Sequence, residues 1–114
     1  MMHKVIEISY LFDFYQNLFT QRQKDLISGY YFEDLSLSEL ANIYSVSRQS
    51  VHETIKKSET KLFELEEKLG LVKRFQNMKM IVEKIDRNIS NAMSLKEKDL
   101  IDLKKLIVDL KNEI

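Results

Sequence analysis

Apolar residues recur along this chain at steps of three and four, the spacing that lines up side chains on one face of an α-helix. A first helix is predicted over residues 3–19, where the spaced apolar positions are Val5, Ile8, Phe12, Tyr15 and Phe19. A second is predicted over about residues 21–31, with Leu26, Ile27 and Tyr30 buried, and a third over residues 37–44. A fourth begins at residue 48. The pattern therefore indicates an all-α fold.

Polar residues mark where these helices begin. In a capping box, a serine or threonine before the helix accepts a hydrogen bond from the backbone three residues on, and the side chain there bonds back to the cap's N–H. The pairs that fit are Thr20 with Gln23, Ser36 with Glu39, and Ser94 with Glu97. Ser47 is predicted to cap the fourth helix through the N–H groups near Ser50. The second, third, fourth and last predicted helices thus each have a local signal for their first residue.

The stretch from Leu35 to Ile55 ends one helix after two turns and starts another at once. Such a pair of helices, joined by a short turn, is a helix-turn-helix, here expected over about residues 36–60 of a first domain, 1–70. The apolar positions that would hold the two helices together are Leu40, Ala41, Val46, Val51 and Ile55. Ser45 stands where such turns often have glycine, so either a strained left-handed backbone or a different turn is expected there.

The remaining chain is predicted to be a C-terminal helical extension, residues 71–114. The apolar stripe continues to about residue 88, with Gly70 as a kink or a helix end, and a polar turn follows at residues 88–94. The last helix aligns Leu100, Leu103, Ile107, Leu110 and Ile114. These are too few for a core of their own, so this helix either folds back onto the chain or pairs with a second copy as a homodimer.

Composition narrows the class of protein. The chain has 114 residues, no proline, no cysteine and two glycines, which favours helix and excludes disulfides and thiolate metal sites. No signal peptide or membrane-spanning run is present, so a cytoplasmic protein that does not insert in a membrane is expected. Eighteen basic and eighteen acidic residues cancel, although residues 41–61 carry a net +2 and residues 71–88 a net +3. This balance argues against tight binding to DNA by overall charge alone.

The start of the fourth helix carries the candidate site. A helix-turn-helix presents the first turns of its second helix to the major groove, where Arg and Gln can pair with guanine and adenine edges. The residues predicted to contact nucleic acid are Arg48, Gln49, Ser50, His52, Lys56 and Lys57. The alternative is that this segment is an ordinary solvated helix face. Glu53 counts against nucleic acid, because it places a negative charge near any phosphate.

Catalysis finds little support in these residues. Only His3 and His52 could act as imidazole bases, and no serine or carboxylate has a catalytic context. His52 has Arg48 and Lys56 four residues away on either side, and these cations disfavour a metal ion. No enzyme activity, metal site or cofactor is expected.

A resemblance adds to this interpretation. Residues 20–57 resemble the promoter-binding fourth region of bacterial sigma factors, and about residues 10–74 are similar to the YlxM family of small bacterial proteins. The residues that match the family's motifs are Leu11, Phe12, Phe14, Tyr15, Thr20, Gln23, Tyr30, Tyr31, Ser36, Leu37, Glu39, Leu40, Ala41, Val46, Ser47, Arg48, Gln49 and Val51. The resemblance implies a sigma-like helix-turn-helix and an accessory or regulatory role in the signal recognition particle pathway.

Two functions follow from these expectations. In the first, the protein binds DNA or the RNA of the signal recognition particle, and acts with that particle's GTPase. In the second, the helix-turn-helix is an inherited scaffold that no longer reads DNA, and the apolar helix faces bind a protein partner or a second copy of the chain.

Overall fold

The structure is a computed structural model that describes residues 2–91 and 96–113. These residues form helices and connecting turns and contain no strand, so the predicted all-α fold is confirmed. The elements are α1 (Met2–Tyr15), a 3-10 turn η1 (Gln16–Leu18), α2 (Gln21–Tyr31), α3 (Leu37–Tyr44), α4 (Arg48–Leu69), α5 (Leu71–Ser90) and α6 (Glu97–Glu113). The chain divides into two compact units, Met1–Val72 and Lys73–Ile114.

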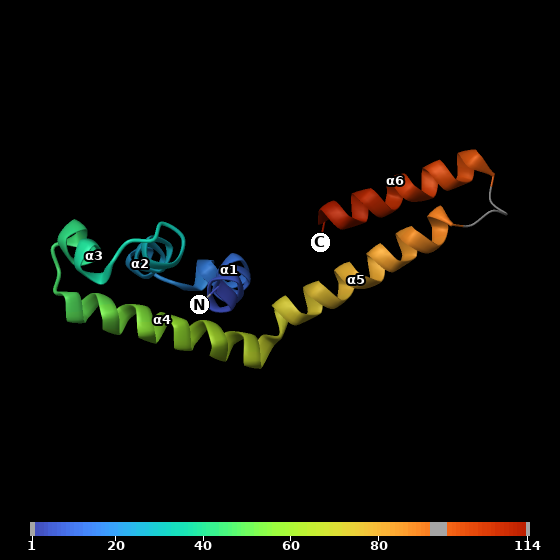
Figure 1. Cartoon of the computed structure of the whole chain (residues 1–114). Helices are drawn as coiled ribbons and strands as arrows, with labels where there is room; N and C mark the ends of the chain where they lie inside the picture. The colour runs from blue at the N-terminus through green and yellow to red at the C-terminus, as the bar shows by residue number, and fades with distance from the viewer. Residues whose placement is uncertain (1, 92–95, 114) are drawn as a thin grey trace. The chain divides into compact units, whose positions relative to one another are not determined.

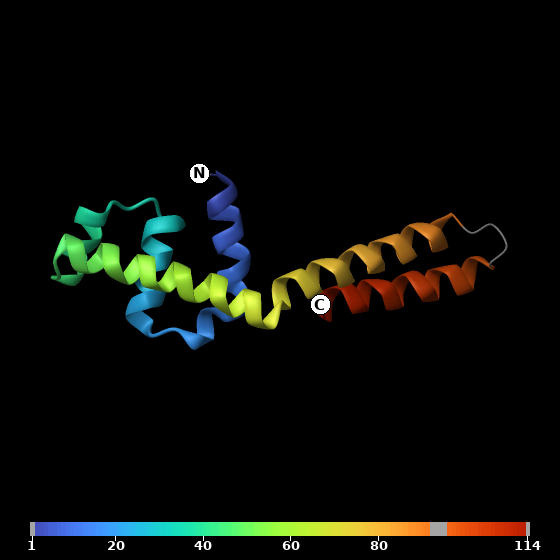
Figure 2. The same cartoon turned by 90° about the horizontal axis from the view of Figure 1, so that it is seen from below.

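In the first unit, α4 is the helix on which the others pack. Helices α1, α2 and α3 lie on the same side of it (Figure 1), and α1 and α2 cross it steeply (Figure 2). The core between them consists of Ile8, Leu11, Phe12, Tyr15, Phe19, Leu26, Ile27, Leu40, Ala41, Val51, Ile55, Leu62 and Val72. Burying these side chains supplies most of the favourable free energy of this unit.

The helix starts lie where the polar residues predict them. Thr20 and Gln23 form a complete capping box, with hydrogen bonds of 2.9 and 3.2 Å. Ser36 and Glu39 form a second one. The Ser47 hydroxyl accepts a hydrogen bond from the backbone N–H of Ser50 at 3.0 Å. The predicted box between residues 94 and 97 lies outside the described residues.

Two boundaries and some burial differ from the prediction. Helix α1 ends at Tyr15 rather than at residue 19, because a tighter 3-10 turn follows and brings Phe19 into the core with an extended backbone. Helix α5 continues to Ser90, beyond the predicted end near residue 88. Tyr30 was predicted to be buried, which is wrong: its exposed fraction is 36%, because it faces a cavity beside α4.

The turn between α3 and α4 is tight and strained. Ser45 has φ 54° and ψ 45°, the left-handed conformation, which is the first of the two alternatives expected for this position. Its N–H bonds to the carbonyl of Ala41, and so does the N–H of Val46. Helix α2 packs closely against α3, since a Cβ on Gly29 of α2 would come within 2.6 Å of the Leu40 side chain. Glycine at this position allows α2 to approach α3.

At the far end of α4, Gly70 takes the left-handed conformation that ends the helix. The first N–H groups of α5 have no carbonyl partner within the helix, and side chains supply the acceptors instead. The Tyr15 hydroxyl accepts from Leu71 N–H at 3.2 Å and donates to Glu66 Oε1 at 2.7 Å. The same carboxylate oxygen accepts from Val72 N–H at 3.0 Å. Tyr15 thereby ties α1 to the junction of α4 and α5.

The second unit is a pair of antiparallel helices, α5 and α6, lying side by side in both views (Figures 1 and 2). The Asp86 carboxylate forms ion pairs with Lys111 at 3.1 Å and with Lys104 at 3.6 Å. Only Val82 and Ile107 are buried among the described apolar residues of this unit. Much of the apolar stripe predicted for these helices is therefore exposed. No helix in the described part of the chain is long and apolar enough to cross a membrane.

The strain at Ser45 gives a direct test of the turn. A side chain in the left-handed region costs about 1 kcal/mol relative to glycine, so Ser45→Gly should raise the free energy of unfolding by about that amount. The matched control is Ser38→Gly, an exposed serine inside α3, which should lower the stability by about 0.5 kcal/mol because glycine disfavours helix. Denaturant unfolding of the two variants measures both values. Changes of the same sign would contradict the left-handed assignment.

Candidate nucleic-acid interface

Helices α3 and α4 form a helix-turn-helix with a three-residue turn, residues 45–47. The core-facing side of α4 is buried at its start, since the exposed fractions of Val51 and Ile55 are 0% and 3%. A helix that buries one face must present the opposite face outward. The first turns of α4 therefore pack against the core on one side and expose their polar residues on the other.

All six residues predicted to contact nucleic acid lie on this segment, and all six are exposed. Residues four apart share a row on a helix, so Arg48, His52 and Lys56 follow one flank of α4. Gln49 and Lys57 follow the next row, with Glu53 between them, and Ser50 lies beyond that row. The six residues are therefore spread around the outer face rather than gathered in a single cluster.

The charge of this face is positive at its start. The first turn of α4 contains no acidic residue, and the positive end of the helix dipole lies there beside Arg48. Glu53 is exposed in the second turn, as expected from its position. Within the described residues, no group of three or more histidine, aspartate or glutamate side chains could hold a metal ion.

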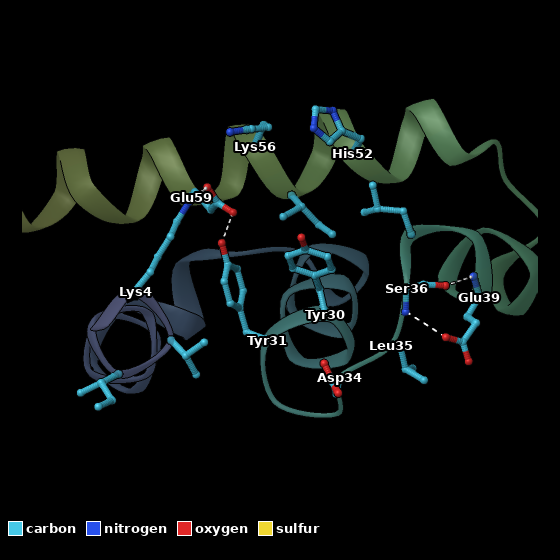
Figure 3. A pocket seen from close by; sticks show the side chains of 14 residues that line it. Lys4, Tyr30, Tyr31, Asp34, Leu35, Ser36, Glu39, His52, Lys56 and Glu59 are labelled. Carbon is cyan, nitrogen blue, oxygen red and sulfur yellow. Dashed lines mark hydrogen bonds and ion pairs between the residues drawn. The ribbon is translucent and has the colours of Figure 1, made fainter. Parts of the chain in front are cut away.

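One flank of α4 borders a cavity of about 770 Å³, shown in Figure 3. Its walls come from the start of α1, the end of α2, the link before α3 and the middle of α4. His52 and Lys56 line it on the α4 side, together with Ile55 and Glu59. The predicted site residues thus divide further, because two of the six face this cavity and four do not.

Glu59 is the main residue that the sequence analysis missed. It is buried, with an exposed fraction of 8%. Its carboxylate accepts a hydrogen bond from the Tyr31 hydroxyl and forms an ion pair with Lys4 at 3.2 Å. Burial raises the pKa of Tyr31 above its ordinary value, and the hydrogen bond to Glu59 raises it further. The available signal was spacing, because Glu59 falls four residues after Ile55 on the buried stripe.

Tyr31 in turn positions the neighbouring ring. The rings of Tyr30 and Tyr31 meet edge to face, with centroids 5.1 Å apart. A connected row from Lys4 through Glu59 and Tyr31 to Tyr30 therefore forms one wall of the cavity (Figure 3). Side chains held by such a row lose little freedom when a ligand binds.

The fold and the exposed start of α4 define the class: an all-helical protein built around a helix-turn-helix. Residues 2–103 match the model of the family UPF0122, described as "Putative helix-turn-helix protein, YlxM / p13 like", and the chain belongs to that family. It is 45% identical, over 97 residues, to UPF0122 proteins of Bacillus cereus strain AH187, Bacillus anthracis strain A0248 and Bacillus thuringiensis strain 97-27. Each match covers 85% of this chain and 88% of the relative. The predicted family membership is confirmed.

Tyr31 allows a test of the buried network by pH. The ordinary tyrosine pKa is 10.0 and that of Tyr31 is raised, so the unfolded chain loses this proton at a lower pH than the folded chain. The stability that depends on the neutral phenol is therefore complete below pH 10.0 and is lost as pH rises through the folded pKa. In Tyr31→Phe, the free energy of unfolding should fall less steeply above pH 10.0 than in the parent.

The control for this measurement is Tyr10→Phe, because Tyr10 is 44% exposed. It should follow the parent curve. Parallel alkaline curves for the parent and Tyr31→Phe would contradict the coupling of Tyr31 to Glu59.

Proposed function

We propose that this protein is a non-enzymatic, nucleic-acid-binding accessory or regulatory protein that contacts DNA or RNA through the start of α4. The observation that carries the proposal is the exposure of Arg48, Gln49 and Lys56 on a helix whose opposite face is buried. Side chains in this place on a helix-turn-helix can reach base edges and phosphates without unfolding the core.

Each residue has a distinct role in this proposal. Arg48 and Gln49 are suited to bidentate contacts with bases, since Arg48 presents two parallel donors and Gln49 presents a donor beside an acceptor. Lys56 and Lys57 lie further along the helix and are suited to phosphates on either side of a groove. Ser50 and His52 supply shorter hydrogen-bonding groups between them. Glu53 lies between Gln49 and Lys57 in the same row and disfavours phosphate at the centre of this face.

The likeness to sigma factors and to the YlxM family supports a more specific role. We infer that the protein acts in the cytoplasm in the signal recognition particle pathway, with the particle's RNA or DNA as the nucleic acid and the particle's GTPase as a protein partner. These assignments rest on resemblance.

A salt titration tests the nucleic-acid proposal. Binding to duplex DNA and to structured RNA should weaken as salt increases, because phosphate contacts release counterions. Lys56→Ala should make the slope of log affinity against log salt shallower by about 1. Arg48→Ala should weaken binding by about 1–3 kcal/mol. Lys68→Ala, an exposed lysine in the last turn of the same helix, is the matched control and should bind like the parent. Affinity that responds neither to salt nor to the first two changes would rule the proposal out.

A homodimer through the second unit is a second proposal, and the exposed apolar residues of α5 and α6 favour it. Two helices alone cannot enclose a core, and the usual solution is a bundle in which a second pair covers the open face. The apolar side chains left exposed are Met78, Met80, Ile81, Ile85, Ile101, Leu103, Leu106, Val108 and Leu110. A second copy of the chain offers a matching surface, since it carries the same residues.

Light scattering of the full chain tests the dimer. Leu106 is 63% exposed and Ile81 is 58% exposed, so glutamate at either position would place a charge in the interface and should convert a dimer to a monomer. Ile43→Glu is the matched control, because Ile43 has a similar exposed fraction of 58% on α3 in the first unit. A parent protein that is already a monomer at high concentration would exclude the homodimer.

A further inference from the structure

The cavity beside α4 has the size of a small-molecule site. Its volume of about 770 Å³ falls within the range of roughly 300–1,000 Å³ that is usual for ligand pockets. Its walls are mainly apolar, with Ile55 and Leu35 contributing, and Tyr30 adds an aromatic ring that is partly exposed. Such walls suit a flat, ring-containing ligand, because aromatic rings stack on tyrosine with little ordering cost.

Of the three carboxylates that line the cavity, Glu59 is ion-paired, and neither Glu39 nor Asp34 has a cationic partner within the described residues. Glu59 is paired with Lys4 and Tyr31. The Glu39 carboxylate accepts a hydrogen bond from the Ser36 N–H in its capping box. Asp34 is exposed and lies on the side of the cavity away from α4 (Figure 3). The acidic groups therefore leave the α4 side of the opening free of negative charge that is not already paired.

The hydrogen-bond donors on the α4 side, Lys56 and His52, are not paired in this way. Within residues 2–91 and 96–113, neither the Lys56 ammonium nor the His52 ring has a hydrogen-bond or ion-pair partner. They lie one turn apart along the rim (Figure 3). A dianionic phosphate can accept hydrogen bonds from both side chains at once. A neutral ligand group would form weaker hydrogen bonds there.

We propose that this cavity binds a free mononucleotide, with the base against Tyr30 and the apolar wall, and the phosphate at Lys56 and His52. The row from Lys4 through Glu59 and Tyr31 holds the Tyr30 ring in place for stacking. Lys56 and His52 are also proposed to contact nucleic acid, so a bound nucleotide occupies groups that the nucleic acid needs. This consequence rests on the proposed function, and it makes the nucleotide an antagonist of nucleic-acid binding.

Calorimetric titration of the full chain with adenosine, guanosine, cytidine and uridine monophosphates tests the site without any nucleic acid present. At least one mononucleotide should bind, and the matching nucleoside and inorganic phosphate should each bind more weakly by about tenfold or more, since each lacks one half of the recognition. Lys56→Ala should weaken binding by about tenfold, the loss expected for one charge-assisted hydrogen bond. Tyr30→Ala should weaken it by about fivefold or more and Tyr30→Phe should not, because stacking needs only the ring.

Lys68→Ala is the control and should bind the nucleotide like the parent, since Lys68 lies outside the cavity. The site is overturned if no mononucleotide binds, if only oligonucleotides bind, or if Lys56→Ala and Lys68→Ala have equal effects. A chain that binds mononucleotide but no DNA or RNA would retain this site and refute the nucleic-acid function. A chain that binds DNA and RNA but no mononucleotide would refute this site and retain the nucleic-acid function.

Discussion

The burial of one face of α4 is the interaction on which the first unit depends. Val51, Ile55 and Leu62 are almost completely inaccessible, and α1, α2 and α3 all pack against the same side of this helix (Figure 1). Once that face is buried, the helical period determines the direction of every other side chain on α4. The exposed rows at the start of α4, the cavity on one flank and the buried carboxylate of Glu59 all follow from this single orientation.

The break between α3 and α4 has its own physical basis. Ser47 supplies the hydroxyl that α4 needs at its first turn, and Ser45 takes the left-handed backbone that lets the chain reverse within three residues. That conformation costs about 1 kcal/mol for a residue with a side chain. Packing of Val46 against the core offsets the cost. The strained residue lies directly before the candidate interface, so the orientation of Arg48 and Gln49 depends on a turn that the core holds in place.

Two of the candidate contact residues belong to two surfaces. Lys56 and His52 are exposed on the outer side of α4 and also line the cavity, whereas Arg48, Gln49, Ser50 and Lys57 do not. A helix-turn-helix with a ligand cavity against its second helix can respond to a small molecule without any change of fold, because the two ligands compete for the same two side chains. The second unit presents a different kind of surface, apolar rather than charged, on α5 and α6.

The sequence by itself determined where α2, α3 and α4 begin, because each cap and its partner lie within three residues: Thr20 with Gln23, Ser36 with Glu39, and Ser47 with Ser50. It also predicted the outward position of the α4 residues, whereas it left the backbone at Ser45 open between a left-handed conformation and a different turn. Only the tertiary structure decided that Glu59 is buried with Tyr31, 28 residues earlier in the chain, and that Tyr30 faces a cavity. It likewise decided that much of the apolar face of α5 and α6 stays exposed. The physical reason is that a helical period shows which side chains share a face, whereas burial depends on which other element comes to cover that face.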